Sequence, residues 1–465
     1  MIVKLRMTGA QHAELRNHLL GPDGNESVAC ALCGRRAGEA IHALCVHKIV
    51  LVPNDECLVR TPSRVTWRTE SIRRALAEAA RRNWAVVKFH SHPQGFSDFS
   101  STDDAADREL FAAVHSWVDS DLPHASVVML PDGKMFGRWI ASSGASYPIN
   151  VIAVAGDDLH FWFPHGADQN DAPRFAERAR QAFGSGTIAL LRRLSVAIVG
   201  CSGTGSPVIE LLVRHGIGRL VLVDPDRIEE RNIDRIIFAC MSDVGRLKVD
   251  VAVEWIARVG VGTEVECIPT NLYDPLAVRR VAECDILIGC MDGSEGRYLR
   301  NRVSSFYSLP YIDVGVRLEA DGQGGISQIC GTVHYLKPGG SSLLSRRAIT
   351  MEAIQAEGLR RTNPQAYSDQ VRSKYISGVR EDRPAVAAVN MHYASLAVLE
   401  LLARVHSYRV EGNCPFAQFG SSLTDPRFEP MEPDGPPCPF QAKHVGRGDT
   451  VPLLENPFLS EIHAA

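Results

Sequence analysis

The sequence of 465 residues lacks two kinds of apolar segment. No apolar run reaches the length of about 18 residues that a membrane-spanning helix needs, and no basic start is followed by an apolar leader. We therefore expect a soluble, cytoplasmic protein. An excess of positive charge is also missing, since the net charge at pH 7 is -4. A mildly acidic surface has no general attraction for nucleic acid or anionic membranes, so neither is expected as a partner.

The cysteines lack the spacing of a disulfide framework. The 12 cysteines are spread over the whole chain, and several lie inside apolar runs such as 286–290, which indicates buried thiols. Cys30 and Cys33 form a C-x-x-C pair, but no second pair follows at the spacing of a zinc ribbon. We interpret this pair as strand packing.

Length and pattern predict an α/β protein of two domains, because a single domain usually holds about 100 to 200 residues. Residues 1–145 show a mixed α/β pattern, and the looser stretch 146–171 is expected to be a linker. Strand and helix patterns alternate over 172–410, which is typical of a doubly wound, Rossmann-like parallel sheet. The tail 411–465 is rich in proline and glycine and is expected to be irregular.

Residues 90–103, H-S-H-P-Q-G-F-S-D-F-S-S-T-D, follow an apolar, strand-like run and contain a metal-site pattern. His90 and His92 stand two apart at the end of the predicted strand, so their side chains project to one side. Asp103, at the start of a predicted helix, can complete a set of three ligands. Three protein ligands leave the fourth position of a tetrahedral zinc ion open to water, which is typical of a catalytic site.

A hydrolytic zinc site also needs a carboxylate that passes a proton from water to the leaving amine. Glu26, directly before the strand-like run 27–33, is the candidate, and Ser100 is the candidate hydrogen-bond donor to the oxyanion. The alternative for Glu26 is a plain solvated carboxylate. Ser100 and Asp103 also fit a capping box for a helix over 102–118, which is compatible with a metal site.

These motifs, E-S-V-A-C-A-L-C-G followed by H-S-H-P and S-S-T-D, resemble the signature of the JAMM (MPN) metalloproteases over about residues 1–145. In that family the two histidines and the aspartate bind zinc, the glutamate activates water, and the serine stabilises the tetrahedral intermediate. The resemblance implies these roles for His90, His92, Asp103, Glu26 and Ser100. It also implies cleavage after the C-terminal glycine of ubiquitin or of ubiquitin-like sulfur carriers.

Residues 196–207 place a glycine turn between a predicted strand and a predicted helix. Gly200, Gly203 and Gly205 allow the backbone to approach a phosphate at the helix N-terminus. Asp224, at the end of the next predicted strand, is placed to bind ribose hydroxyls. At this point a hydride-transfer cofactor and ATP are both open.

Charged residues further along the chain favour ATP. The runs 224–235, 245–248 and 290–297 supply cations for a triphosphate and an acid for magnesium. Attack of a carboxylate on an α-phosphate needs such neutralised charge, whereas a dehydrogenase does not. Taken singly, Arg235 and Lys248 could be solvated charges and Asp292 a turn residue.

Together the nucleotide motifs resemble the ubiquitin-activating superfamily, which includes the adenylyltransferases of thiamine and molybdopterin synthesis, over about residues 172–408. The resemblance implies that the glycine turn and Asp224 bind ATP and that Asp292 holds Mg²⁺. It implies contacts with the phosphates, and hence a part in catalysis, for Asn232, Arg235 and Lys248. An arginine from a short N-terminal helix, often supplied across a homodimer in that superfamily, corresponds to Arg178 or Arg180.

Two cysteine features of that superfamily are missing. Residues 341–345 contain serines where paired cysteines often hold a structural zinc, and the crossover segment 338–387 has no cysteine for a thioester. Cys330 is the nearest thiol, but its strand-like setting predicts burial, which makes a poor nucleophile. We therefore expect the chain either to stop at the acyl-adenylate or to transfer the acyl group to a serine of the crossover segment.

Both predicted sites act on a C-terminal glycine carboxyl at the end of an extended tail. This predicts a component of a bacterial-type ubiquitin-like conjugation system that adenylates the modifier and also cleaves its peptide or isopeptide bonds. A ubiquitin-conjugating-type enzyme is then an expected partner. The alternatives are activation and trimming of a sulfur-carrier protein in biosynthesis, and a scaffold whose two sites are inactive.

Overall fold

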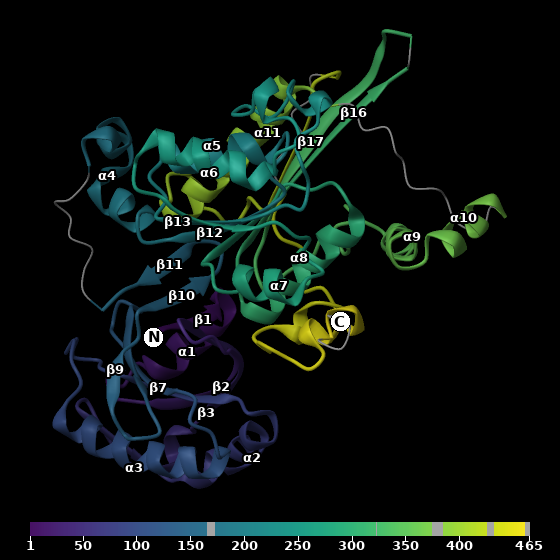
Figure 1. Cartoon of the computed structure of the whole chain (residues 1–465). Coiled ribbons are helices and arrows are strands. Elements are labelled where there is room, and N and C mark those ends of the chain that lie inside the picture. The colour runs from purple at the N-terminus through teal and green to yellow at the C-terminus, as the bar shows by residue number, and fades with distance from the viewer. Residues whose placement is uncertain (165–172, 322, 374–384, 426–431, 461–465) are drawn as a thin grey trace. The chain divides into compact units, whose positions relative to one another are not determined.

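The computed structural model describes residues 1–164, 173–321, 323–373, 385–425 and 432–460. The chain divides into two compact units. The first unit contains Met1–Gly166 together with Ser305–Ser308 and His444–Glu455. The second contains Ala167–Ser304, Leu309–Lys443 and Asn456–Ala465. Each unit has its own sheet (Figure 1).

The first unit is built on a nine-stranded mixed sheet with the order β11-β10-β1-β3-β2-β6-β7-β8-β9. Its strands are β1 (Ile2–Thr8), β2 (Val28–Arg36), β3 (Ile41–Leu51), β6 (Ala85–Ser91), β7 (His124–Met129), β8 (Met135–Ile140), β9 (Ser146–Pro148), β10 (Val151–Ala155) and β11 (Leu159–Trp162). A separate hairpin is formed by β4 (Cys57–Thr61) and β5 (Arg64–Trp67).

Apolar side chains cover both faces of this sheet. On one face Leu15 and Leu19 of α1 (Gly9–Leu19) pack into the core, and on the other face α2 (Arg73–Arg82) and α3 (Ser101–Val118) do so, α3 through Phe111. Cys30 belongs to the α2–α3 face and Cys33 to the α1 face. The two thiols therefore point away from each other, which confirms strand packing.

The structure differs from the sequence-based expectation in the stretch 146–171. Its residues 146–162 form strands β9, β10 and β11 of the sheet instead of a plain linker. Strand β10 pairs in parallel with β1, and Ile152 and Val154 are buried in the core. The partner strand lies at the other end of this unit's sequence, so the local pattern gives no sign of the pairing.

The C-terminal tail is also more ordered than expected. Strand β18 (Gln418–Ser422) pairs with β17 in the second unit. In the first unit, the backbone amide of Gly34 in β2 donates to the carbonyl of Gly446 at 2.9 Å, and the amide of Asp449 donates to the carbonyl of Arg35 at 2.6 Å. Backbone pairing of this kind gives structure to a segment with little sequence periodicity.

The second unit has a seven-stranded sheet with the order β14-β13-β12-β15-β16-β17-β18. The other six strands are β12 (Ser195–Val199), β13 (Arg219–Val223), β14 (Glu264–Ile268), β15 (Ile286–Gly289), β16 (Tyr311–Ala320) and β17 (Ile326–Leu336). Strands β12 to β16 are parallel, while β17 and β18 run antiparallel. The parallel part has the Rossmann-like strand order. The order in which the chain adds strands reverses between β12 and β15, and sheets of this kind bind ligands at that point.

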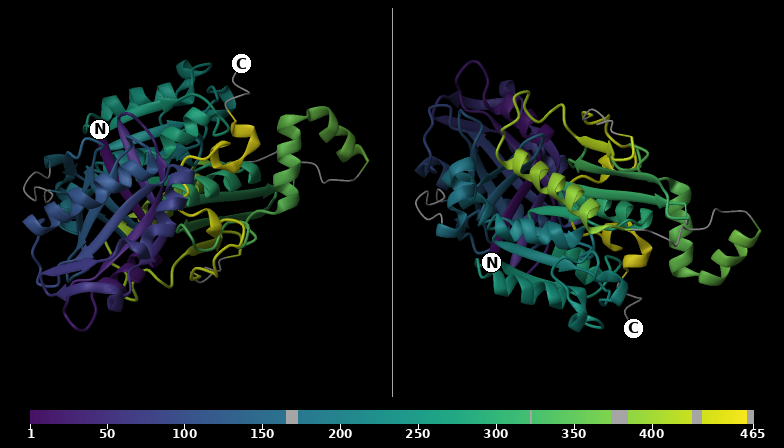
Figure 2. Two further views of the ribbon diagram at one scale, coloured as in Figure 1. Left: turned by 90° about the horizontal axis from the view of Figure 1, so that it is seen from below. Right: turned by 90° about the horizontal axis from the view of Figure 1, so that it is seen from above.

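Helices cover both faces of this second sheet. The helices of the second unit are α4 (Glu177–Leu191), α5 (Gly205–Arg214), α6 (Lys248–Val259), α7 (Pro275–Val281), α8 (Ser294–Tyr307), α9 (Met351–Thr362), α10 (Pro364–Arg372) and α11 (Ala387–Val405). In Figure 1, α5, α6 and α11 lie on one side of the strands and α7 and α8 on the other. The pair α9 and α10 lies at the periphery of the unit in both views of Figure 2. No helix within the described ranges is long and apolar enough to cross a membrane.

Candidate functional site

The predicted metal ligands come from the end of β6 and the start of α3. His90 is the second-last residue of β6, and His92 directly follows the strand. Ser100 is the N-cap of α3: its Oγ accepts from the amide of Asp103, and the carboxylate of Asp103 accepts from the amide of Ser100 at 2.8 Å. The predicted capping box is therefore confirmed, and it fixes Asp103 in the first turn of α3.

The three side chains converge. Nε2 of His90 lies 3.0 Å from Oδ1 of Asp103, and Nε2 of His92 lies 3.5 Å from Oδ2 of the same carboxylate. The two Nε2 atoms are 3.2 Å apart. One ligand atom from each residue thus lies within 4.8 Å of the others. Both histidines are buried, at 1% and 5% exposure.

The donor atoms fit a zinc ion. Nδ1 of His92 lies 2.7 Å from the carbonyl oxygen of Phe96, and because a carbonyl only accepts, Nδ1 carries the proton. Nε2 of His92 then faces Asp103 and His90 and is the atom that can bind a metal. Burial and the charge of Lys88 lower the pKa of His90 to about 4, so its ring is neutral at pH 7. Burial lowers the pKa of His92, but its hydrogen bonds with Asp103 and Phe96 outweigh burial and raise this pKa above its usual value. Two imidazoles that each bind through a deprotonated nitrogen, together with one carboxylate, are a set that zinc accepts.

Glu26 lies beside this group, directly before β2. It is 6% exposed. Its backbone is held by the β4–β5 hairpin, since its amide donates to the carbonyl of Thr61 at 2.9 Å and its carbonyl accepts from Arg60 at 3.0 Å. Burial raises the pKa of Glu26 to about 7, and the charge of Asp103 acts in the same direction while His92 opposes it. A carboxyl group with a pKa near neutrality can both take up and release a proton.

The hydroxyl of Ser100 is already engaged. It donates to Oδ2 of Asp103 at 2.7 Å. To donate to a substrate oxyanion, this hydroxyl must turn away from Asp103, so the predicted catalytic role of Ser100 stays a prediction.

In the second unit, the glycine turn lies where the strand order reverses. It follows β12 and opens α5. Gly200 has a φ of +99°, and a Cβ there would stand 2.7 Å from Cγ of Met291, in the loop after β15. A Cβ on Gly205 would stand 1.8 Å from the carbonyl oxygen of Gly200. The turn is therefore closed to side chains, and it lies against the loop that carries the exposed Asp292.

Asp224 and Lys248 meet at the end of β13. The carboxylate of Asp224 accepts from the amides of Cys201 at 2.7 Å and Asp226 at 2.9 Å. Nζ of Lys248 lies 2.7 Å from the carboxylate of Asp226 and 4.0 Å from that of Asp224. Burial raises the pKa of Asp224. The carboxylate is thus fixed to the glycine turn through the amide of Cys201.

Arg235 lies next to the glycine turn, because a Cβ on Gly203 would stand 3.1 Å from its Cδ. Its guanidinium donates to the carbonyl of Arg231 at 2.7 Å. Asn232 is buried, and its Oδ1 accepts from the amide of Glu229 at 3.1 Å. Arg235 is therefore brought to the predicted nucleotide site, while the amide oxygen of Asn232 holds its own loop.

Arg178 and Arg180 are both exposed on α4. Arg178 donates to Gln181 of the same helix at 3.2 Å. Their predicted role depends on a second copy of the chain and stays a prediction. Cys330, expected to be buried, is only partly buried in β17.

Sequence reasoning missed a buried ionic network beneath the Asp292 loop. Arg300 of α8 is 0% exposed and donates to the carbonyl of Met291 at 3.0 Å and to Oη of Tyr311 at 2.9 Å. Asp313 of β16 is also 0% exposed; it accepts from Arg297 and lies 3.6 Å from Arg300. Its only sequence signal is an acidic residue inside an apolar strand, which does not reveal the partners.

The strand order and the glycine turn define an α/β nucleotide-binding class of protein, and the comparison with known families agrees. Residues 176–437, more than half of the chain, match the model of the ThiF family, so the chain belongs to that family. Residues 10–139 match a second model, described as prokaryotic homologs of the JAB domain. The suspected fusion of the two domain types is confirmed.

The similar curated proteins match only part of the chain. The sulfur carrier protein adenylyltransferase of Thermus thermophilus is 32% identical over 133 residues, which are 29% of this chain and 49% of that protein. The ubiquitin-like modifier-activating enzyme 5 of Oryza sativa subsp. japonica is 30% identical over 162 residues, 32% of this chain and 36% of that protein. The chain thus spans less than half of the length of either relative.

Among solved structures, the crystal structure of E. coli MccB with succinimide is similar to 57% of this chain and 73% of its own chain. The sequence identity is 20% and the TM-score 0.44.

Proposed function

We propose that the chain is a two-site enzyme of a ubiquitin-like protein pathway. Its second unit uses ATP to adenylate the C-terminal carboxylate of the modifier, and its first unit cleaves peptide or isopeptide bonds after that C-terminus. The observation that carries the proposal is the presence, in one chain, of a nucleotide-type glycine turn and of a three-ligand metal group beside a buried carboxyl. Membership of the ThiF family and the names of the relatives support the adenylation step.

In the adenylation step, the tail carboxylate attacks the α-phosphate of ATP, an acyl phosphate bond forms, and pyrophosphate leaves. The N-terminus of α5 and its glycine turn are placed to receive phosphates, and Asp224 to receive the ribose. Lys248 would exchange its bond with Asp226 for a phosphate oxygen, and Arg235 would turn from Arg231 in the same way. Asp292 would hold magnesium, which neutralises phosphate charge when bound.

In the cleavage step, His90, His92 and Asp103 would hold zinc, which acidifies water and polarises the scissile carbonyl when bound. Glu26 would take the proton from water and deliver it to the leaving amine, a role that its raised pKa in the metal-free site supports. The hydroxyl of Ser100 would donate to the oxyanion.

Further proposals concern partners. Arg178 or Arg180 would reach the ATP site of a second copy in a homodimer, and a ubiquitin-conjugating-type enzyme would receive the activated modifier. The described part of the crossover segment carries α9 and α10, and its sequence has no cysteine. The acyl group therefore either stays on the adenylate or passes to a serine, which trapping of the adduct and peptide mapping would distinguish.

Pyrophosphate exchange tests the proposal when it is run with candidate ubiquitin-like proteins beside a zinc measurement on the same sample. Exchange that depends on a modifier with a free C-terminal glycine, in a protein with one equivalent of zinc, is the expected result. A metal-free protein that shows no pyrophosphate exchange with any candidate would contradict both the adenylation and the cleavage part of the proposal.

The second candidate function is activation and trimming of a sulfur-carrier protein, which the name of the Thermus thermophilus relative favours. It predicts a thiocarboxylate product when a sulfur donor is present. The missing paired cysteines and crossover thiol make the chain itself a poor carrier of a persulfide.

A further inference from the structure

A lysine is buried two residues before the first metal-binding histidine. Lys88 of β6 is 5% exposed, and its Nζ lies 2.6 Å from Oδ1 of Asp107. Asp107 is 3% exposed and stands one turn after Asp103 on α3. A direct ionic hydrogen bond thus joins the strand that carries His90 to the helix that carries Asp103.

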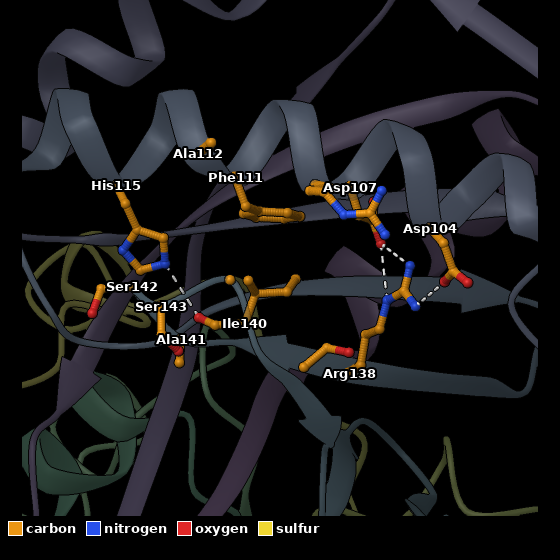
Figure 3. A pocket seen from close by; sticks show the side chains of 13 residues that line it. Asp104, Asp107, Phe111, Ala112, His115, Arg138, Ile140, Ala141, Ser142 and Ser143 are labelled. Atoms are coloured by element: carbon orange, nitrogen blue, oxygen red, sulfur yellow. Dashed lines mark hydrogen bonds and ion pairs between the residues drawn. The ribbon is translucent and has the colours of Figure 1, made fainter.

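The second oxygen of Asp107 binds a different strand. Oδ2 accepts from Nη2 of Arg138 in β8 at 2.7 Å and from its Nε at 3.0 Å. Arg138 also binds the exposed Asp104 at 2.5 Å, and its guanidinium lies 3.9 Å from the ring centroid of Phe99. Figure 3 shows Arg138 between Asp107 and Asp104, in the wall of a pocket of about 510 Å³ between α3 and β8.

One carboxylate therefore fixes three elements: α3, β6 and β8. Apolar contacts alone, such as those of Phe111 and Val114, already hold α3 on the sheet. A buried ion pair rarely stabilises a fold more than apolar residues of the same size would, but its hydrogen bonds are directional. Such a network can set the position of a helix along a strand where apolar packing tolerates small shifts.

We propose that Asp107 is a positioning residue of the metal site: by binding Lys88 and Arg138 it sets α3 against β6 so that Asp103 meets His90. The inference rests on the proposed zinc function of the first unit. Asp107 itself is not a ligand, because both of its oxygens are occupied by cations. Its effect is exerted through the distance between Asp103 and the two histidines.

The test is the zinc affinity of the full chain, measured by competition with a chromogenic chelator. We expect Asp107→Asn to weaken zinc binding by about 10- to 100-fold, the range seen when groups that orient metal ligands are removed. Asp104→Asn is the matched control, because it removes the exposed partner of the same Arg138. Asp104 directly follows Asp103 in the first turn of α3. Because an exposed ion pair contributes little, the control should change the zinc affinity by less than about twofold.

A double variant separates positioning from simple stability. Lys88→Met with Asp107→Leu replaces the buried pair by apolar groups, and Arg138 keeps its bond with the exposed Asp104. The melting temperature of the metal-free protein should therefore stay close to that of the wild type. Zinc binding should stay at least tenfold weaker, since the directional bonds are gone. Wild-type zinc affinity in this double variant would overturn the proposal, as would equal losses in Asp104→Asn and Asp107→Asn. A wild-type protein that binds no zinc would instead refute the proposed function, so the two failures are distinguishable.

Discussion

At the scale of single residues, the environment of Glu26 explains how a carboxyl group can serve a hydrolytic site at neutral pH. Its side chain is buried beside Asp103, and its backbone is held by the β4–β5 hairpin. Water would hold the same carboxyl ionised at neutral pH, so its ability to exchange protons there comes from the fold. In the proposed cleavage, the first unit would therefore have a proton carrier in place before the substrate binds.

The shifted pKa of Glu26 predicts that the free energy of unfolding of the metal-free protein depends on pH. Folding raises this pKa from 4.5 to about 7, so between these values the folded state retains a proton that the unfolded state has lost. The free energy of unfolding therefore falls as pH rises through this window. Glu26→Gln, which cannot ionise, should lose less stability than the wild type from pH 4.5 to 7. Urea unfolding of both proteins across this range checks it, and parallel curves would contradict the shift.

Arg235 offers a residue-level test of the nucleotide site. It lies against Gly203 of the glycine turn, whereas the neighbouring Arg231 pairs with Glu229 at the surface. Arg235→Ala should reduce pyrophosphate exchange by about 100-fold or more, because a cation aimed at developing charge is lost. Arg231→Ala is the control and should stay near the wild-type rate. Equal exchange rates for the two variants would contradict a role of Arg235 in the nucleotide site.

Motif spacing predicts which residues meet when the partners are close in sequence. His90, His92 and Asp103 lie within 14 positions of each other, so one strand, one loop and one helix start determine their convergence. Asp107, Arg138 and Lys88 give no comparable signal, since β8 reaches α3 only through the order of the sheet. Arg300 and Asp313 were missed for the same reason: isolated charges in apolar elements do not reveal their long-range partners.

At the scale of elements, the second sheet is the part that sequence predicts best. Regular alternation of apolar strands with amphipathic helices leaves few topologies open, and right-handed crossovers select among them. The first unit is harder, because β9 to β11 are short and β10 joins the sheet by pairing with β1, at the other end of this unit's sequence. Their pattern is therefore read as linker until the partner strand is known.

The turn between β12 and α5 gives a prediction at this scale. A Cβ on Gly205 would stand 1.8 Å from the carbonyl oxygen of Gly200, so Gly205→Ala must displace the turn and should abolish ATP binding by calorimetry. Gly186→Ala in α4 is the control, because a Cβ there meets nothing within 4 Å. Zinc content of both variants should match the wild type. Normal ATP binding by Gly205→Ala would show that the turn does not receive phosphate.

At the scale of the whole molecule, the chain combines two compact units with different chemistry. In the proposed function, the second unit forms a bond to a carboxylate and the first breaks a bond at a carbonyl. Their products and substrates are related, because cleavage after a C-terminal glycine releases the carboxylate that adenylation consumes. We therefore predict that the two reactions run in sequence on one modifier.

The most direct measurement uses one ubiquitin-like protein in two forms, free and with its C-terminal glycine blocked as an amide to a short peptide. With the wild-type enzyme, zinc and ATP, both forms should support pyrophosphate exchange, the blocked form only after a lag during which the peptide is released. Glu26→Gln should retain zinc, exchange normally with the free form and fail with the blocked one. Exchange by Glu26→Gln with the blocked form, or no exchange by the wild type with the free form, would contradict the account.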